Sequence, residues 1–444
     1  MSRRAKASQA DGRPRMRLLL RHASRDFRLM WGGQALSLFG SQLTGLALPL
    51  AVLRFHGSAV DAGLVIAIRY LVTTAARLPA GAVADHLDRR RLMVAADTVR
   101  ALAMLGISGL LLAGSLPMPV LIPLAAAEGA GTAFFSPAQA AALRHLVGPG
   151  DLTVALGLNQ ARGYTVTLVG PLFGGLLFAF APWLPFVLDA ATYVVSCLCV
   201  AAIRGALGGG TASQDPAMRE AISGLRYVLR NRFLLTLTAW AALLNFATAG
   251  IGFGLVLVVG PGHGVGVGAA YSAVACAGIV GAMLAPGMLR LPAKAIIIGA
   301  SVLTPLLCAA VAADPVPAVA IAGLSGITLL APMIAVPFDS RVYAVVPDEW
   351  TGRVQGALFL VGGSIYPFGG VAMGALAQHG SPRLGYAVLT AVLAAVLALT
   401  VTPAFLQQLT EFDAAYRPAE PEPPHDDHEP RSVQPESAGP LGAH

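Results

Sequence analysis

The chain has 444 residues, of which 56% are hydrophobic and only 12% carry a formal charge. Soluble globular proteins are about a quarter charged, so this composition excludes that class and indicates a membrane protein. Twelve membrane-spanning helices of about 20 residues would use roughly 240 positions and leave about 200 for loops and tails. All four cysteines lie in apolar stretches, so we expect no disulfide framework, no metal site and no cofactor.

The net charge of +7 is concentrated around the start of the first apolar stretch, where nine basic residues occur. Residues 1–27 are therefore typical of a basic cytoplasmic tail that contacts anionic membrane lipids, and we expect no nucleic-acid partner. The apolar run 18–20 is too short for the core of a cleavable signal, so the first span should be retained. The nine residues are Arg3, Arg4, Lys6, Arg13, Arg15, Arg17, Arg21, Arg25 and Arg28.

Apolar stretches predict two groups of six membrane-spanning helices, in residues 28–203 and 233–405. Basic residues gather in alternate connections, which by the positive-inside rule places both termini in the cytoplasm. The predicted fold class is an all-α protein of the inner or plasma membrane with two six-helix halves. The spans are expected at 28–53, 61–84, 92–114, 117–139, 156–181, 183–203, 233–260, 267–289, 293–313, 316–338, 353–378 and 383–405.

Two polar segments flank the second half. Residues 204–232 form the predicted cytoplasmic central loop, in which Asp215-Pro216 should start a short helix. We expect that helix to lie in the membrane interface rather than to bind a partner, with one apolar face made by Met218, Ile222, Leu225 and Leu229. Residues 406–444 are acidic and Pro-rich, which predicts a disordered cytoplasmic tail, and its HDDHE cluster is better explained by solvation than by metal binding.

The two halves contain similar segments at equivalent places. The sequence at 136–160, before and into the fifth span, resembles that at 336–359, before and into the eleventh. Likewise, GPLFGG at 170–175 resembles YPFGG at 366–370. Parallel repeats around a central site are an arrangement found in secondary transporters.

The loop between the second and third spans resembles the signature of the major facilitator superfamily at Gly81, Asp85, Arg89 and Arg90. The resemblance covers residues 25–405. It implies alternating access, with an inner gate in which Asp85 meets Arg groups and the positive N-terminal end of the eleventh helix, near Gly352. An ordinary positive-inside loop would explain the arginines but not the acidic residue.

Further motifs resemble a narrower group within the superfamily. Asp97, Arg100 and the segment FFSPAQAAAL at 134–143 are similar to the group that contains the enterobactin exporter and macrolide efflux proteins. The glycine and proline motif of the fifth span resembles part of the antiporter motif of drug and proton exchangers. That motif has two interpretations, a tight seam that prevents leak or generic packing of small residues. It consists of Gly170, Pro171, Gly174 and Gly175.

Few ionisable residues lie inside the predicted spans, and such residues are the usual functional candidates. Glu128 is near the middle of the fourth span, where many proton antiporters of the superfamily have an Arg nearby that is absent here. It is interpreted either as the proton carrier or as a structural ion pair with Arg69 or Arg162. Asp97 and Arg100, three residues apart on one helical face, predict a structural charge pair. Asp189 is expected near the end of a peripheral helix, without a transport role.

Polar residues are sparse on the spans expected to line the central cavity. A sugar or phosphate carrier would need denser polar or cationic groups, so a small, partly apolar substrate is favoured. No P-loop or H-E-x-x-H motif occurs, which argues against an enzyme. The predicted function is export by proton antiport, and we expect a monomer. An importer of a nutrient or amphipathic metabolite is the alternative, and a non-transporting scaffold is the third. The candidate cavity residues are Gln34, Gln42, Asn159, Arg162, Trp240 and Asn245.

Overall fold

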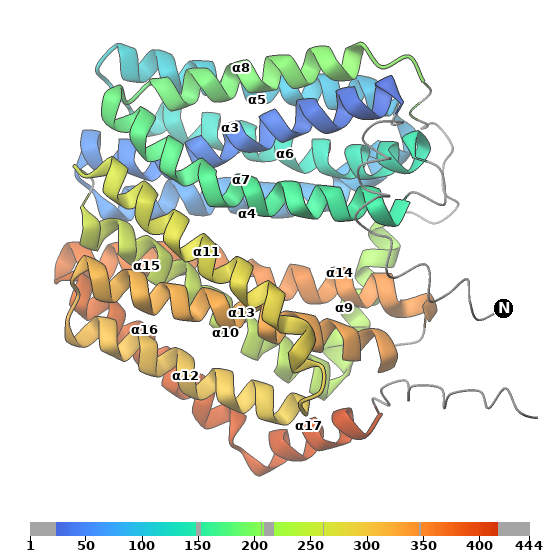
Figure 1. Ribbon diagram of the computed structural model, residues 1–444, viewed down its shortest axis with the longest axis vertical. Helices are drawn as coiled ribbons and strands as arrows, with labels where there is room; N and C mark the ends of the chain where they lie inside the picture. Colours follow the sequence, from blue (N-terminus) through green and yellow to red (C-terminus); the bar gives the residue numbers. More distant parts are fainter. Residues whose placement is uncertain are drawn as a thin grey trace, which may run out of the picture.

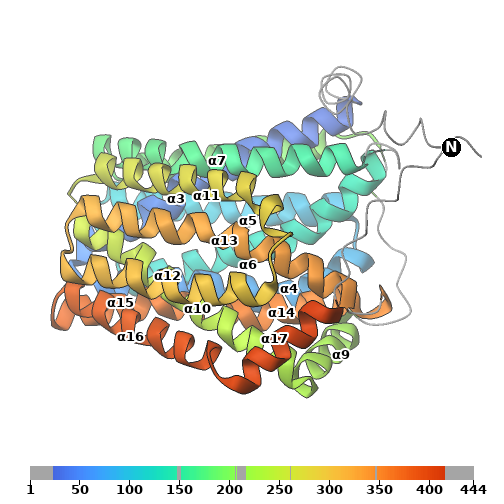
Figure 2. The same cartoon turned by 60° about the horizontal axis from the view of Figure 1, so that its bottom comes forward.

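The computed structural model describes residues 24–147, 152–205, 207, 217–260, 262–345 and 348–415. Within these ranges the regular structure is helical and no strand occurs. Twelve stretches of helix are long and apolar enough to cross a membrane. Figures 1 and 2 show these helices lying side by side with their axes roughly aligned. The all-α fold with twelve spans is therefore confirmed.

The first half consists of six helices joined by short connections. Side chains cap several of their N-termini: Ser24, Ser58 and Asp88 each accept a hydrogen bond from the backbone N–H three residues later, at 3.0 to 3.1 Å. These caps explain why the helices begin where the polar connections end. The helices are α3 (Arg25–His56), α4 (Ala59–His86), α5 (Arg89–Leu112), α6 (Met118–Leu146), α7 (Leu152–Phe180) and α8 (Leu184–Ala201).

The second half repeats this pattern with one difference. The predicted eleventh span is divided into α14 and α15, which meet at Ile365. Pro367 stands in the first turn of α15, and its ring nitrogen cannot donate an intrahelical hydrogen bond, so the helix is interrupted there. The helices are α10 (Arg232–Val259), α11 (Gly264–Met288), α12 (Ala293–Ala313), α13 (Pro317–Val345), α14 (Asp348–Ser364), α15 (Tyr366–His379) and α16 (Pro382–Thr400).

The two halves form separate layers of the bundle. In Figure 1, α3 to α8 lie above and α10 to α16 lie below. We name each end of the bundle after a connection between consecutive helices that lies there. The α3–α4 end, on the left of Figure 1, contains Gly57, and the α4–α5 end, on the right, contains Asp88.

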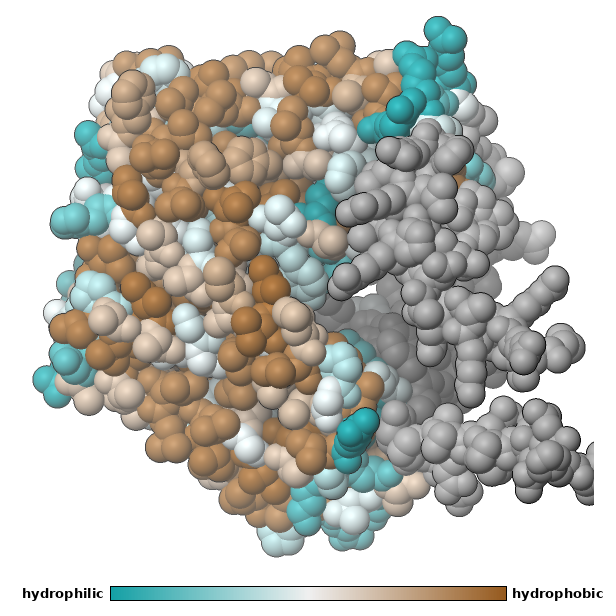
Figure 3. All heavy atoms as spheres, viewed as in Figure 1, coloured by the Kyte–Doolittle hydropathy of each residue, from teal (hydrophilic) through white to brown (hydrophobic). Residues whose placement is uncertain are grey.

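The outer surface of the bundle is apolar. Figure 3 shows hydrophobic residues over most of the face in view, with hydrophilic residues mainly toward the two ends. Several large apolar side chains point outward with more than 60% of their surface exposed: Leu102, Leu112, Phe180, Leu198, Met283 and Leu306. An apolar surface of this extent fits contact with lipid tails.

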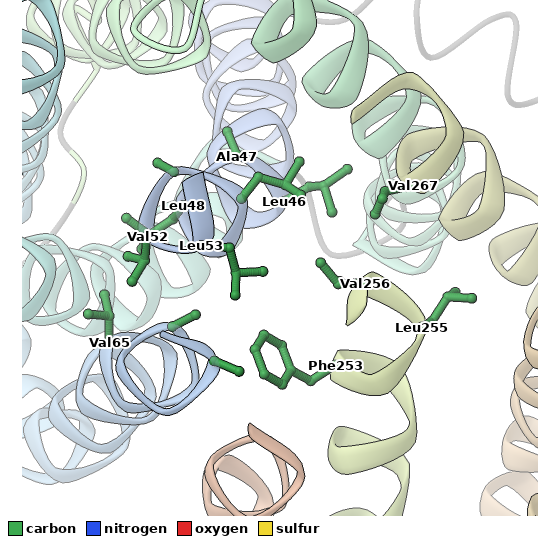
Figure 4. Packing of buried hydrophobic residues seen from close by; sticks show 14 of the residues in the cluster. Leu46, Ala47, Leu48, Val52, Leu53, Val65, Phe253, Leu255, Val256 and Val267 are labelled. Atoms are coloured by element: carbon green, nitrogen blue, oxygen red, sulfur yellow. The ribbon is translucent and has the colours of Figure 1, made fainter. Parts of the chain in front are cut away.

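Apolar side chains also line the interior between the halves. Figure 4 shows Leu46 and Leu53 of α3 close to Phe253 and Val256 of α10. All four side chains are less than 9% exposed. Side chains of the first and seventh spans therefore belong to one apolar cluster that extends across the boundary between the halves.

The central loop contains the predicted short helix, α9 (Ala217–Arg230). Its packing differs from the expected one, because α9 contacts α14, α4 and α10 (Figure 2). Val228 is fully buried in that contact, whereas Leu229 of the predicted apolar face is 51% exposed. The residues Asp215 and Pro216, expected to start the helix, lie outside the described residues.

The C-terminal segment corrects another expectation. Residues 406–444 were expected to be disordered, but the helix α17 (Pro403–Ala415) includes 406–415, and 416–444 lie outside the described residues. Three apolar side chains of α17 are buried: Phe405, Leu409 and Phe412. The Asp413 carboxylate accepts hydrogen bonds from the first two backbone N–H groups of α12, at 2.7 and 3.2 Å, and lies 3.2 Å from the Arg341 guanidinium. The helix thus caps α12, whose own N-cap is a proline.

Candidate functional site

A cavity of about 510 Å³ lies between the two halves, and we call it the central cavity. Its wall is largely apolar and includes no charged side chain. The polar side chains in the wall are one amide and five hydroxyls: Gln42, Thr167, Thr248, Tyr271, Thr328 and Tyr366. A wall with sparse, uncharged hydrogen-bonding groups suits a small and partly apolar ligand.

Three of the six predicted cavity residues line a cavity. Gln42 lines the central cavity and donates to the Thr167 hydroxyl at 2.9 Å. Trp240 and Asn245 instead line a smaller cavity of about 230 Å³ in the second half, which shares Thr248 with the central one. Trp240 Nε1 donates to the Ser301 hydroxyl, and Asn245 Nδ2 donates to a backbone carbonyl, both at 3.0 Å.

The other three predicted residues do not line either cavity. The Gln34 side chain is buried and accepts hydrogen bonds from Gln139 and, at 3.2 Å, from the Arg162 guanidinium. Arg162 also donates to the Trp31 carbonyl at 3.3 Å. Gln34 precedes Gln42 by about two helical turns, toward the α4–α5 end, and this displacement removes the group from the cavity wall. Asn159 is half-buried on α7.

Glu128 belongs to a buried group of charged side chains in the first half. Its carboxylate is only 1% exposed and forms an ion pair with the Arg69 guanidinium, whose Nη2 donates at 3.2 Å. The hydroxyls of Thr132 and Tyr193 donate to the same carboxylate at 3.0 and 3.3 Å. The pairing with Arg69 is one of the two ion pairs considered for Glu128, whereas Arg162 binds elsewhere.

The second pair of the group is Asp97 with Arg100, which the structure brings together at 3.0 Å. Arg100 Nη2 also donates to the Ser41 hydroxyl at 3.3 Å, and its Nε lies 3.9 Å from the Glu128 carboxylate. Its guanidinium stacks 3.9 Å from the centre of the Tyr193 ring. We call the residues joined in this way the charge network: Ser41, Arg69, Asp97, Arg100, Glu128, Thr132 and Tyr193.

Asp189 was expected to be peripheral, but it is fully buried where α8 packs on α3. The Thr44 hydroxyl donates to its Oδ2 at 2.7 Å, and the Thr192 hydroxyl donates to its Oδ1 at 3.3 Å. Tyr193, a member of the charge network, adjoins Thr192 in α8. Asp189 is therefore a buried polar residue beside the network that its position in the sequence did not reveal.

The glycine motif of α7 forms close contacts on two sides. A Cβ at Gly174 would lie 2.7 Å from the Leu43 carbonyl oxygen of α3. A Cβ at Gly175 would collide with the Gly264 carbonyl of α11, and one at Gly268 would lie 3.0 Å from the backbone of Leu172. The contact of Gly174 lies within the first half, whereas those of Gly175 and Gly268 join the halves at the α3–α4 end, and we call these two the α7–α11 seam.

A second seam joins α4 to α15 at the same end. A Cβ at Gly63 would lie 2.9 Å from the Gly370 carbonyl oxygen, and one at Gly374 would collide with the Ala59 carbonyl. Gly370 ends the YPFGG segment that resembles GPLFGG of α7. The sequence similarity between the halves thus corresponds to two equivalent seams, in which the halves approach each other through glycine and backbone at the α3–α4 end.

The signature loop lies at the α4–α5 end. Arg89 Nη1 donates to the Leu207 carbonyl at 3.0 Å, and Arg90 Nη2 donates to the Gly205 carbonyl at 2.9 Å. Both arginines therefore bind the chain that follows α8, in their own half, rather than the eleventh span. Gly81 lies in α4 with open space beside its Cα. The side chains of Asp85 and of the first turn of α14, where Gly352 lies, are outside the described part of the chain.

Side chains that commonly bind metal ions do not gather within the described ranges, where no group of three or more His, Cys, Asp or Glu residues has suitable geometry. The HDDHE cluster lies beyond residue 415, outside these ranges. The chemistry of the site therefore rests on the cavity wall, the buried charges and the seams.

Two curated relatives are efflux proteins. The chain is 27% identical to the multidrug efflux pump Tap of Mycolicibacterium fortuitum over 401 residues. The aligned region covers 85% of this chain and 95% of the relative. It is 26% identical over 223 residues to macrolide efflux protein A of Streptococcus pyogenes, covering 50% of this chain and 55% of the relative.

Solved transporters share the fold at low sequence identity. A mutant of the nucleoside transporter NupG superposes with a TM-score of 0.68 at 13% identity, covering 88% of this chain and 100% of that chain. A bacterial homologue of the iron transporter ferroportin gives a TM-score of 0.64 at 14% identity, covering 88% and 99%.

The sequence profile of the Major Facilitator Superfamily matches residues 30–370, which is most of the chain. The resemblance noted in the signature loop is therefore confirmed over both halves. With its twelve spans, the protein is a multi-pass plasma-membrane transporter of small molecules and not an enzyme. The chain belongs to the Major Facilitator Superfamily.

Proposed function

We propose that this transporter exports a small, partly apolar molecule in exchange for protons, acting as a monomer. The observation that carries the proposal is the central cavity, whose wall is apolar, uncharged and supplied with a few hydroxyls. The efflux function named for both curated relatives supports the direction of transport.

The coupling to protons is argued from the position of the charge network. Gln42 lines the central cavity, and its neighbour Ser41 is hydrogen-bonded to both Arg100 and Tyr193 of the network. A change of protonation in the network can therefore reach the cavity through one turn of α3. Buried ionisable groups inside a membrane are costly, and transporters retain them for ion pathways.

Alternating access is argued from the two ends. The α4–α5 end carries the basic connections, and the positive-inside rule favours the cytoplasmic side for such an end. With that orientation the α3–α4 end faces outward, and the two seams bring the halves into backbone contact there. These contacts support a state closed to the outside, in which the inner gate expected at Asp85 would be open.

The direction and coupling can be tested in inside-out membrane vesicles with radiolabelled erythromycin and ethidium as probes. An acid interior imposed on vesicles that contain the protein should drive accumulation of at least one probe, and vesicles without the protein should show none. Depletion of the probe under the same gradient would instead establish import. Equal content with and without the protein, for a wide panel of compounds, would contradict transport of this substrate class.

Asp85→Asn tests the inner gate. The substitution removes the charge that would meet Arg groups and the N-terminal end of α14 when the α4–α5 end closes. We expect loss of most transport in the vesicle assay, with expression and membrane insertion equal to those of the parent. His86→Asn, at the exposed neighbouring position, is the matched control and should transport normally. Transport by Asp85→Asn at the parental rate would end the gate hypothesis.

A further inference from the structure

Asp189 differs from the other buried carboxylates of the first half in lacking a cation. Its side chain is fully buried, and its two oxygens contact the hydroxyls of Thr44 and Thr192. Among the described residues, no basic nitrogen lies within 4.0 Å of this carboxyl group, whereas Glu128 and Asp97 each have an arginine within that distance. A buried charge without a partner is strongly unfavourable, so the carboxyl group is expected to be neutral here.

The charges of the network lead to the same conclusion. Arg69 and Arg100 supply two positive charges, and Glu128 and Asp97 supply two negative charges in contact with them. These four charges balance without Asp189. Ionised Asp189 would leave the buried group with one net negative charge, whereas protonated Asp189 leaves it neutral.

The space around Asp189 is shaped for this carboxyl group. A Cβ at Gly40 of α3 would lie 3.0 Å from the Asp189 Cα and would collide with its Oδ1, so only glycine leaves room there. Thr44 Oγ1, the 2.7 Å partner of Oδ2, also lies 3.3 Å from the Ser41 carbonyl. Ser41 and Tyr193 then connect this site to Glu128, at 2.9 and 3.3 Å.

The helix α8, which carries Asp189, packs against α3, α5 and α7. In the middle of α3, the hydroxyls of Ser41 and Thr44 face α8. The groups of the charge network beside the site are Asp97 and Arg100 of α5, Glu128 of α6, Arg69 of α4 and Tyr193 of α8 itself. The other titratable residues on α7 and α8 are Arg162, Tyr164, Cys197 and Cys199, and those of α3 and α5 stand near the ends of the two helices: Arg25, Asp26, Arg28, Arg54, His56, Arg89, Arg90 and Arg91. Both positive groups nearest the site are already engaged by Glu128 and Asp97.

We propose that Asp189 is the group that binds and releases the transported proton, and that Glu128 is the fixed counter-ion that holds Arg69 and Arg100 in place. Binding converts the Asp189 carboxylate to a carboxylic acid, and release transfers that proton to water. This inference rests on the proposed proton antiport and names its proton site. Glu128, the residue expected from the sequence to carry the proton, then has the structural role.

The proton site can be tested without any substrate, by infrared difference spectroscopy of the purified full-length protein titrated with base. A buried carboxylic acid gives a carbonyl stretching band that disappears when the proton leaves. We expect the parent to show one such band, Asp189→Asn to lack it, and the folded fraction of Glu128→Gln, isolated as the monodisperse peak, to retain it. Thr44→Val removes a hydrogen bond from the acid, so the band should remain but shift in frequency.

Two results would overturn the proposal. One is a titrating band that persists unchanged in Asp189→Asn, and the other is loss of the band in Glu128→Gln with retention in Asp189→Asn. If Asp189→Asn proves unstable, the shift in Thr44→Val identifies the band by itself, because an acid elsewhere would not respond to that hydroxyl. A parent that shows this band but moves neither probe in vesicles would leave the Asp189 site standing and count against the proposed function.

A transport measurement completes the test, with erythromycin or ethidium, whichever the parent moves. A gradient of one pH unit sustains at most about tenfold accumulation per exchanged proton. Asp189→Asn should lose this accumulation entirely while it still exchanges labelled for unlabelled probe at a rate close to that of the parent. Full accumulation by a well-folded Asp189→Asn protein would contradict the assignment.

Discussion

Gly175→Ala is expected to abolish most transport, although it adds a single methyl group. The new Cβ would collide with the Gly264 carbonyl oxygen in the α7–α11 seam, where backbone meets backbone and nothing can rotate away. Overpacking of this kind costs about 1–3 kcal/mol, which corresponds to roughly a 5- to 150-fold loss of the state closed at the α3–α4 end. The transport cycle would then lack one of its two closed ends.

The measurement combines vesicle transport with labelling of a cavity residue. Thr328 lines the central cavity, so Thr328→Cys in a background without the four native cysteines reports access to it. In Gly175→Ala, an impermeant maleimide added from the α3–α4 side should label this cysteine much faster than in the parent. Gly157→Ala is the matched control, because it lies on the same helix and its Cβ would meet nothing within 4 Å. Parental labelling and transport in Gly175→Ala would show that the seam is not needed for closure.

Glu128→Gln is expected to destabilise the protein more than any other single change in the charge network. The substitution leaves the Arg69 guanidinium without its counter-ion and weakens the contact with Arg100. Breaking one partner of a buried pair costs about 3–5 kcal/mol, and because 28% of the Arg69 side chain is exposed, we expect about 3 kcal/mol. Exchange and probe binding should be lost together as the folded fraction falls.

The control is the double variant Arg69→Gln with Glu128→Gln. Removing both charges leaves no stranded ion, so stability should recover in part. Asp189→Asn, which keeps a neutral side chain in a site that is neutral already, should stay within about 1 kcal/mol of the parent. The stabilities of the parent and the three variants are compared by heating each protein in detergent and measuring how much of its monodisperse peak remains in size-exclusion chromatography. Equal stability of Glu128→Gln and the parent would exclude a structural role for the ion pair.

Much of the fold could be predicted from the sequence, because a membrane span depends on the length and apolar composition of one helix and not on its contacts with other helices. About 20 apolar residues are needed whatever the partner helix is, so all twelve spans were found by length. The end of the chain shows where composition misleads. The acidic, Pro-rich tail predicted disorder from residue 406, yet Phe405, Leu409 and Phe412 recur at helical spacing, and that periodicity was the better guide to α17.

The candidate site was less predictable, because contacts between distant segments decide it. Asp189 is near the end of its span in the sequence, and its main partner, Thr44, is 145 residues away. Three residues make this contact, Gly40, Thr44 and Asp189, and none of them has a sequence context that predicts it. Gln34 and Arg162 are hydrogen-bonded to each other and do not line the central cavity, because each side chain is engaged by a partner inside the first half.

The glycine seams have a consequence for how easily the transporter changes state. A surface of backbone and glycine has no side-chain rotamers to immobilise, so closing it costs little conformational entropy, and opening it releases little. The free energies of the two end states can then differ by only a few kcal/mol. A ligand shifts such an equilibrium by no more than its difference in affinity for the two states, so a small gap lets a weakly held substrate or a single proton decide which end is open.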